Sequence, residues 1–392
     1  MIELSRDQKN VLDSLIDWYL DDSKSQYISL GGYAGTGKTT LIALFRKKID
    51  SLKKSKKKVK VAFVTFTGKA ARVLDIKLKE SKSIYKNDYV GTIHSLIYSP
   101  IIDNNDEIIG WEKKDKVIYD LIIIDEGSMV NGIIWNDLLS YQKPIIVVGD
   151  HGQLPPIRGS FNLMSDPILR LEQIHRQVRD NPIIRISTIA RKYGYIPVNK
   201  YSDTVKKIDK EDNDSREEVE ELLSSYNKDT FILCGYNSTR IKLNKFVRQS
   251  LGFQDPVVSV NDRVVCLRNN HRKNIYNGML GTIKSLERDD KKWFYANINI
   301  DNNDYIYKGL IYADQFNNPQ PINFTKKRKN ILKGDLFDFG YALTVHKAQG
   351  SQTDRVILFE ERFKQIDDES WQRWLYTAVT RAVKELYIIG SK

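Results

Sequence analysis

Short apolar runs alternate along the chain with longer segments whose apolar residues recur at helical spacing. In the first half, four strand-like apolar runs end in small or acidic residues, at 27–32, 59–67, 120–126 and 144–150. Such runs are typical of parallel strands that are buried on both faces and carry functional groups at their carboxyl ends. The pattern therefore predicts a doubly wound α/β domain.

The second half contains another set of apolar runs, at 230–237, 341–350, 355–361 and 385–390. A helical pattern, WLYTAVTRAVK, precedes the last of them. These elements predict a second α/β domain, which has no phosphate loop of its own.

Two segments interrupt these patterns. From about Val258 to Lys333, short alternating segments and turn signals such as Asn277-Gly278 predict a small β-barrel within the second domain. A turn at 103–106 separates two strand patterns and predicts a β-hairpin that projects from the first domain. The expected domains are 1–180, with the hairpin insertion at 97–117, and 181–257 together with 334–392, with the barrel insertion at 258–333.

Length and composition are those of a soluble globular protein. At 392 residues the chain exceeds one ordinary core and has room for two domains. No apolar run approaches the roughly 18 residues that span a bilayer, and the first residues lack the apolar core of a signal peptide. We therefore expect a cytoplasmic protein with no membrane association.

The charge favours a polyanionic partner. A formal net charge of +12 and a pI of about 9.3 suit nucleic acid, because each neutralised phosphate releases a counterion. The Lys-rich runs at 53–60 and 326–329 are interpreted as solvated loops. Cys234 and Cys266 lack C-x-x-C spacing and are interpreted as small buried hydrophobes, and the five histidines form no cluster with metal-ligand spacing.

The segment GGYAGTGKTT, at 31–40, predicts a nucleotide site. Gly32, Gly37, Lys38 and Thr39 fit the pattern G-x-x-x-x-G-K-[ST]. In this loop, backbone N–H groups cradle phosphates, the lysine reaches the outer phosphates and the hydroxyl holds magnesium. The following helix would direct its amino terminus at the phosphates. The loop alone is compatible with a kinase, a switch or a motor.

Residues elsewhere in the chain favour a motor. Asp125-Glu126 ends a strand pattern, so one carboxylate could hold magnesium and the other could deprotonate the attacking water. Gln153 follows another strand of the first domain and is a candidate γ-phosphate sensor. Arg381 is a candidate for an arginine that stabilises the transition state across a domain interface. The competing interpretation of Arg381 is a surface salt bridge.

Eight segments occur in the order of the motifs of superfamily 1 helicases: GGYAGTGKTT, FTGKAARVL, GTIHSLIY, IIIDEGSM, VVGDHGQLPPI, LEQIHRQ, ALTVHKAQGSQTDRVIL and YTAVTRA. The chain most resembles superfamily 1B DNA helicases of the RecD/Dda-like (Pif1-like) branch, and the resemblance covers nearly all of it. It implies an α/β fold with two RecA-like P-loop domains in tandem, 1A and 2A. A β-hairpin insertion (1B) would lie in the first and a small SH3-like β-barrel insertion (2B) in the second.

The resemblance implies an ATP and Mg²⁺ site. Gln8 matches the glutamine that reads adenine, so ATP is the expected nucleotide. The implied nucleotide-binding residues are Gln8, Gly32, Gly35, Gly37, Lys38, Thr39, Thr40, Asp125 and Gly350. The implied catalytic residues are Lys38, Glu126, Gln153, Arg176 and Arg381. Thr39 and Asp125 would hold the metal.

It also implies a track for a nucleic-acid strand. The matching residues are Thr65, Thr67, Lys69, Thr92 and His94 in the first domain and Thr344, His346 and Lys347 in the second. Such donors would grip phosphates without reading sequence, although either histidine could be an ordinary structural residue. Trp111 is the expected aromatic at the duplex junction, and packing onto its own domain is an equally compatible role.

The implied function is an ATP-dependent 5′-to-3′ DNA helicase that translocates on single-stranded DNA and separates duplex. We expect a monomer in a bacterial or phage-infected cell, acting on single strands and duplex junctions, with unidentified replication or recombination partners. A single-strand translocase with little unwinding and a non-motor, ATP-controlled single-strand-binding module remain open. RNA is also open as the track, because only 2′-OH contacts distinguish it.

The barrel segment is compact beside that of Dda. No long additional segment is present that could brace it against the hairpin. We therefore expect strand separation to be less rigidly coupled to translocation than in Dda.

Overall fold

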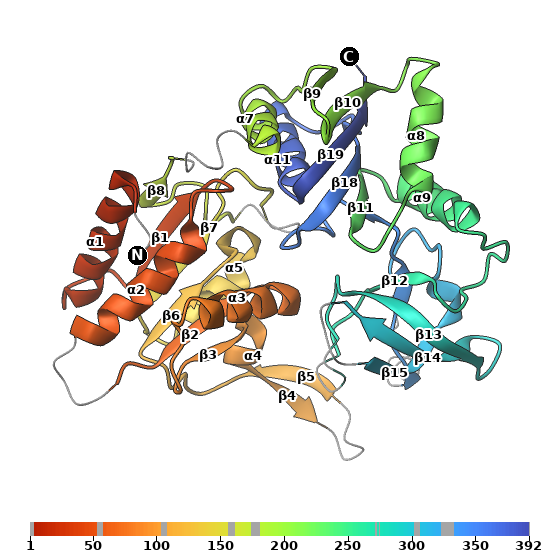
Figure 1. Cartoon of the computed structure of the whole chain (residues 1–392). Helices are drawn as coiled ribbons and strands as arrows, with labels where there is room; N and C mark the ends of the chain where they lie inside the picture. Colours follow the sequence, from red (N-terminus) through yellow and green to blue (C-terminus); the bar gives the residue numbers. More distant parts are fainter. Residues whose placement is uncertain are drawn as a thin grey trace. The chain divides into compact units, whose positions relative to one another are not determined.

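The computed structural model describes residues 4–52, 58–102, 108–155, 161–173, 181–270, 273, 275–301, 306–322 and 333–391. The chain divides into two units, Met1–Ile184 and Arg185–Lys392, and each contains its own sheet (Figure 1). The hairpin turn at 103–106, the Lys-rich run at 326–329 and most of the run at 53–60 lie outside the described residues. No helix in the described ranges is long and apolar enough to cross a membrane.

The first unit is built on a six-stranded parallel sheet in the order β3-β2-β6-β7-β1-β8. Its strands are β1 (Tyr27–Gly32), β2 (Val61–Thr65), β3 (Tyr89–Thr92), β6 (Leu121–Ile124), β7 (Ile145–Gly149) and β8 (Leu169–Leu171). Its helices are α1 (Arg6–Leu20), α2 (Lys38–Leu52), α3 (Gly68–Glu80), α4 (Ile93–Ile97) and α5 (Gly132–Leu139). The predicted parallel sheet is confirmed.

Alternate residues of these strands enter two different hydrophobic clusters. In β6, Leu121 and Ile123 belong to the cluster that contains Phe45 of α2. Ile122 and Ile124 belong to the cluster that contains Trp135 of α5. Both faces of the sheet are therefore buried, which explains why β6 is apolar at every position rather than at alternate ones.

A two-stranded antiparallel arm follows α4. It consists of β4 (Tyr98–Ile102) and β5 (Ile108–Lys113), with Tyr98 opposite Lys113 and Pro100 opposite Trp111. In Figure 1 this arm extends away from the parallel sheet of its own unit. It occupies the segment for which a projecting hairpin was expected.

The second unit contains a six-stranded sheet in the order β17-β11-β18-β19-β10-β9. Its strands are β9 (Asn199–Ser202), β10 (Val205–Asp209), β11 (Thr230–Cys234), β17 (Ala342–Thr344), β18 (Thr353–Phe359) and β19 (Ala382–Gly390). Its helices include α7 (Pro182–Tyr193), α8 (Ser215–Ser224), α9 (Asn237–Ser250) and α11 (Asp368–Val379). All neighbouring strands are parallel except β9, which is antiparallel to β10.

The expected helix over WLYTAVTRAVK is wrong in its second half. Helix α11 ends at Val379, and β19 begins at Ala382, which pairs with Thr353 of β18. Pairing in the sheet thus overrides the local helical pattern.

An antiparallel sheet lies between β11 and β17 in the sequence. Its strands are β12 (Arg263–Cys266), β13 (Leu280–Arg288), β14 (Trp293–Ile300), β15 (Ile306–Tyr312) and β16 (Phe337–Phe339), in the order β15-β14-β13-β12-β16. A bridge between Ile311 and Asp335 joins β15 to the residues just before β16. This inserted sheet occupies the segment for which a small β-barrel was expected.

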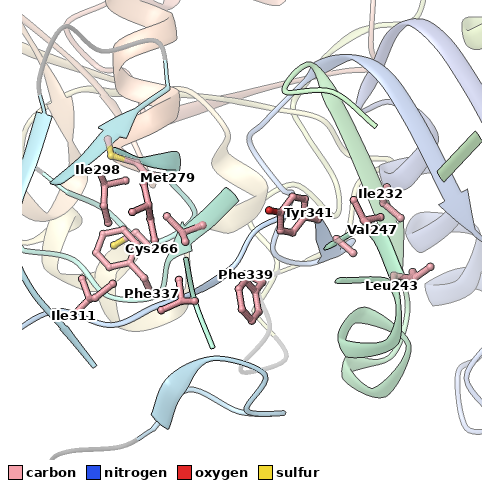
Figure 2. Packing of buried hydrophobic residues seen from close by; sticks show 14 of the residues in the cluster. Ile232, Leu243, Val247, Cys266, Met279, Ile298, Ile311, Phe337, Phe339 and Tyr341 are labelled. Atoms are coloured by element: carbon pink, nitrogen blue, oxygen red, sulfur yellow. The ribbon is translucent and has the colours of Figure 1, made fainter. Parts of the chain in front are cut away.

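The inserted sheet and the parallel strands share one hydrophobic core, part of which Figure 2 shows. Ile232 of β11 and Val247 of α9 belong to the same cluster as Ile298 of β14 and Phe337 of β16. Because this cluster is continuous, the inserted sheet is packed onto the rest of its unit.

A buried polar network reinforces this junction. Asp262 accepts two hydrogen bonds from the Arg248 guanidinium, at 2.8 and 2.9 Å, and one from the Tyr341 hydroxyl at 2.7 Å. Asn244 is fully buried, and its side-chain oxygen accepts from the backbone N–H groups of Tyr341 and Ala342. Each charged or polar group here has a partner, as buried groups require.

Both cysteines are buried and unpaired in disulfides. Burial raises the pKa of Cys234 and of Cys266 to about 12, so both remain protonated at neutral pH. Their interpretation as small buried hydrophobes is confirmed.

Candidate nucleotide and nucleic-acid sites

Three loops meet at one edge of the first sheet. The glycine-rich loop follows β1, Asp125-Glu126 follows β6, and the segment 150–153 follows β7. Strand β7 pairs in parallel with both β1 and β6, with Gly31 opposite Gly149. The carboxyl ends of these strands therefore bring the three loops together.

The glycine-rich loop encloses its own lysine. The Lys38 ammonium donates to the carbonyl oxygens of Gly32 at 2.6 Å and Tyr33 at 3.0 Å. Gly35 and Gly37 have φ angles of 79° and 82°, in the left-handed region that favours glycine. Helix α2 begins at Lys38, so its first N–H groups face the inside of the loop. The arrangement is suited to phosphate, which could replace the carbonyl oxygens as the acceptor for Lys38.

Asp125 and Glu126 lie in a turn instead of on a straight strand. Glu126 has φ 57° and ψ 41°, a left-handed conformation that is uncommon outside glycine. On a strand, adjacent side chains would point to opposite faces, and this turn removes that constraint. At Gly127 a Cβ atom would lie 2.5 Å from a methyl carbon of Val147, so no larger residue fits there without movement.

The carboxyl group of Asp125 interacts electrostatically with Lys38 of the glycine-rich loop. Burial raises the pKa of its carboxyl group, and the Glu126 backbone N–H, at 2.9 Å, and the positive charges of Lys38 and Lys77 oppose that effect. A cation at this position would stabilise the ionised carboxylate further. Within the described ranges no group of three or more His, Cys, Asp or Glu side chains could hold a metal ion. Thr39 and Asp125 fit a magnesium ion that takes most of its ligands from phosphate and water.

Gln153 is buried beside the same loops. Its side-chain amide donates to Asp150 at 3.3 Å, and Asp150 also accepts from the Gly152 backbone at 2.9 Å. The ring of His151, in the same turn, lies with its centroid 4.2 Å from that of Tyr33 in the glycine-rich loop. The turn after β7 and the loop after β1 are thus in direct contact.

Gln8 connects α1 to the glycine-rich loop. Its side-chain oxygen accepts from the Ser5 backbone in a capping box, and its side-chain nitrogen donates to the Thr36 carbonyl oxygen at 3.0 Å. Gln8 is buried. The predicted adenine-reading residue therefore also positions the phosphate loop, a role that sequence reasoning missed.

Most of the first-domain residues expected to grip a strand lie at the next two strands of the same edge. Thr65 and Thr92 end β2 and β3 and are opposite each other in the parallel pair. Thr67 is the N-cap of α3, and its side chain accepts a hydrogen bond from the Ala70 N–H. Lys69 lies in the first turn of this helix. Thr92 is the N-cap of α4. The His94 ring lies near the rings of Phe66 and Tyr98, with centroid distances of 5.8 and 5.7 Å.

The structure does not bring every predicted residue to this edge. Trp111 lies on β5 and is 45% exposed. Arg176 lies outside the described residues.

In the second unit, Arg381 and the loop at Gly350 are joined. The Arg381 guanidinium donates to the carbonyl oxygens of Thr377 at 2.9 Å and Ser351 at 3.2 Å, and to the Thr380 hydroxyl at 3.1 Å. Gly350, adjacent to Ser351, has φ 69°. Arg381 is buried, so its interpretation as a surface residue is wrong.

Thr344 is the last residue of β17, which pairs with β11, and His346 and Lys347 lie just beyond it. Thr344 and Lys347 line a pocket of about 50 Å³ together with Asn237 and Arg240 of α9. Burial lowers the pKa of Lys347 to about 8 and also lowers the pKa of His346. A partly buried ammonium at a pocket wall is suited to an anionic ligand such as a phosphate group.

Comparison with known proteins shows which proteins this chain is similar to. Residues 20–158 match the AAA domain family, and residues 339–389 match the UvrD-like helicase C-terminal domain family. The RecBCD enzyme subunit RecD of Buchnera aphidicola subsp. Schizaphis graminum is 26% identical over 93% of this chain and 70% of that protein. The ATP-dependent RecD2 DNA helicase of Deinococcus radiodurans is 26% identical over 99% of this chain, which spans only 49% of that relative.

Solved structures show the same fold. The Pif1 helicase from Bacteroides in complex with ADP-AlF3 and ssDNA superimposes with a TM-score of 0.55 and 18% identity, covering 99% of this chain and 92% of that one. The Pif1 helicase from Candida albicans gives a TM-score of 0.50 and 17% identity, covering 99% and 95%. The two domain matches and the RecD-type relatives, together with a fold shared with Pif1 helicases, support a superfamily 1B ATP-dependent DNA helicase similar to RecD and Pif1.

Proposed function

We propose that this protein is an ATP-dependent DNA helicase that translocates 5′ to 3′ on single-stranded DNA and separates duplex. One observation carries the proposal: a single sheet edge presents Thr92, Thr65, Asp125, Gln153 and the glycine-rich loop in the order of strands β3, β2, β6, β7 and β1. This order supports the proposal, because the residues that we propose to grip the strand would lie beside those that we propose to bind the nucleotide, on one sheet. Movement of one set would be felt directly by the other.

In the proposed ATPase site, Lys38 would contact the outer phosphates, Thr39 and Asp125 would hold Mg²⁺, which would neutralise phosphate charge, and Glu126 would deprotonate the attacking water. Gln153, Arg176 and Arg381 contact the γ-phosphate, and Gln8 contacts adenine. Arg381 belongs to the second unit, so hydrolysis would depend on closure of the two units around ATP. Alternating grip on the strand would then convert each hydrolysis into a step of one nucleotide.

The remaining proposals concern the DNA track and the assembly. The β4–β5 arm serves as the wedge, with Trp111 at the junction, and the inserted sheet is an SH3-like domain. Thr344, His346 and Lys347 grip the strand from the second unit. The protein acts as a monomer on single strands and forks.

The test uses two DNA duplexes that differ only in carrying a 5′ or a 3′ single-stranded tail, at fixed low salt with ATP and Mg²⁺. We expect unwinding only from the 5′ tail. Unwinding from the 3′ tail would refute the polarity. Hydrolysis that single strands stimulate, without unwinding of either duplex, would support a translocase, and slow hydrolysis unaffected by DNA would support a non-motor module. An RNA strand of the same sequence tests the track.

A further inference from the structure

The base of the β4–β5 arm is held by Tyr141, which lies just beyond the end of α5. The Tyr141 hydroxyl, two residues beyond that helix, lies 3.0 Å from the Ile97 carbonyl oxygen and 2.7 Å from the Lys114 carbonyl oxygen. Ile97 immediately precedes β4, and Lys114 immediately follows β5. Their backbones are also bonded to each other, N to O, at 2.8 Å. One hydroxyl therefore spans both chain ends of the arm.

A second bond joins the arm to α5 itself. The hydroxyl of Tyr98, the first residue of β4, donates to the Asp137 carboxylate. Burial is the main cause that raises the pKa of Tyr98 well above its usual range, and the bond to Asp137 is the second. The hydroxyl therefore keeps its proton and remains a donor. The Lys113 ammonium, at the end of β5, donates to the Ser140 hydroxyl at 3.0 Å. Both strands of the arm thus contact the same short stretch, 137–141.

Helix α5 is firmly anchored in the first unit. Ile134, Trp135 and Leu138 are buried in the cluster that also contains Ile124 of β6. The helix begins at Gly132, in the segment that directly follows Asp125-Glu126. The arm is therefore fixed to β6, the strand that leads into the turn with the two carboxylates, and a displacement of this sheet would carry the arm with it.

We propose that α5, acting through Tyr141 and Asp137, is the brace that holds the β4–β5 arm rigid during duplex separation. This inference rests on the proposed helicase function. A wedge separates strands only if it does not yield when the duplex is driven against it. The sequence contains no long segment that would brace the arm from the inserted sheet, and the contacts with α5 supply a brace within the first unit. Tyr98, Asp137 and Tyr141 are positioning residues in this proposal.

The test compares the wild type with the double variant Tyr98→Phe, Tyr141→Phe, which keeps both rings and removes only the two hydroxyls. Tyr119→Phe is the matched control, because Tyr119 packs against the same hydrophobic cluster and no hydrogen bond joins its hydroxyl to the arm in the described part of the chain. The first readout is hydrogen–deuterium exchange of peptides spanning 97–114. The second is the ratio of duplex unwinding to ATP hydrolysis stimulated by single strands.

We expect the double variant to exchange the arm's amides about tenfold faster, the effect of losing two hydrogen bonds of ordinary strength. Unwinding per ATP should fall at least about fivefold while hydrolysis stays within about twofold of the wild type, because the ATPase loops are untouched. Tyr119→Phe should change neither readout.

Unchanged exchange, or unchanged unwinding per ATP, in the double variant would overturn the brace. Parallel loss of hydrolysis and unwinding would also overturn it, since the damage would then lie in the ATPase unit. If the wild type unwinds neither tailed duplex, the proposed function fails. The exchange comparison, which requires no DNA, would still decide whether α5 holds the arm.

Discussion

At the scale of single residues, the side chain of Lys38 is held by the glycine-rich loop that precedes it. Its ammonium bonds to two carbonyl oxygens of the glycine-rich loop, so the loop is already shaped around a positive charge. Phosphate oxygens would replace these acceptors without a large rearrangement of the backbone.

Lys38→Ala should lower ATP hydrolysis by about 10²- to 10³-fold, the usual cost of removing one charged donor from a transition state. Binding of a labelled single-stranded oligonucleotide, measured by fluorescence anisotropy, should be partly retained because the strand-gripping residues belong to other strands. Lys48→Ala, an exposed lysine on the same helix, is the control. Hydrolysis at the wild-type rate in Lys38→Ala would exclude the glycine-rich loop as the ATP site.

Arg381 tests the dependence of hydrolysis on the second unit. Arg381→Ala should leave binding of a fluorescent ATP analogue within a few fold of the wild type and reduce turnover by about 10³-fold or more, as expected for an arginine supplied in the transition state. Arg373→Ala, which removes a partly buried arginine of α11 that pairs with Glu369 on the same helix, should leave turnover unchanged. Normal turnover in Arg381→Ala would contradict the interdomain mechanism.

The lowered pKa of Lys347 leads us to expect that binding of single-stranded DNA depends on pH. Its pKa of about 8 in the free protein is below the ordinary value for lysine, so the ammonium loses its proton as the pH rises through 8. Phosphate prefers the charged form, and binding above pH 8 must therefore take up a proton. Affinity for single-stranded DNA should fall by up to about fivefold between pH 8 and pH 9, by linkage.

In Lys347→Arg this pH dependence should disappear, because arginine stays charged throughout that range. In Lys347→Met the affinity should be lower at pH 7, and the slope of log affinity against log salt should fall by about one. Binding by the wild type that is flat from pH 7 to 9, with an unchanged salt slope in Lys347→Met, would remove Lys347 from the track.

The sequence predicted which residues belong to the candidate sites better than it predicted the hydrogen bonds and helix caps that these residues form. Gly32, Gly37 and Lys38 belong to one short sequence motif, so they can be recognised without knowledge of the fold. The role of Thr92 as a helix cap has a weaker signal, a threonine followed three residues later by Ser95, just before a helical run. The bond between Gln8 and the Thr36 carbonyl joins segments 28 residues apart, and no local pattern announces it.

At the scale of elements, strands that are buried on both faces were the easiest to predict. Strands β6 and β7 consist of apolar residues at every position. Strands β9 and β10 were missed because lysines interrupt them, including Lys207, which is buried against Glu360 at 2.7 Å. The partner of Lys207 is distant in sequence, so the burial of this lysine cannot be predicted from the residues around it. Without that information β10 does not contain an apolar run that would indicate a strand.

The junction between α9 and the inserted sheet predicts a stability effect. Asp262→Ala would leave the Arg248 guanidinium buried without its carboxylate and would remove the acceptor of the Tyr341 hydroxyl. The free energy of unfolding should fall by about 3–5 kcal/mol, the range for breaking a buried ion pair on one side. Urea unfolding followed by circular dichroism measures it.

The exposed Asp255→Ala is the comparison for this measurement, and it should change the free energy of unfolding by no more than about 0.5 kcal/mol, as for most surface substitutions. Equal losses in the two variants would mean that the Asp262 network does not stabilise the junction.

At the scale of the whole molecule, sequence order was more informative than any single motif. Eight motifs in their sequence order predicted a superfamily 1B helicase, which the domain matches and the RecD-type relatives support. The parallel sheet of the second unit is discontinuous in sequence, since the inserted sheet separates β11 from β17. What sequence could not predict is how that sheet is attached, because Arg248, Asp262 and Tyr341 come from separate segments with no shared period.

The continuous core of the second unit has a consequence for engineering. Ile232, Val247, Phe337, Phe339 and Tyr341 belong to one cluster, so the inserted sheet supplies part of the interior that its neighbours need. Excising it and closing the gap with a short loop would expose apolar side chains of β11 and α9. Such a truncated protein should aggregate instead of surviving as a minimal motor, and exchange of this sheet between relatives would succeed only if the bordering aromatic residues travel with it.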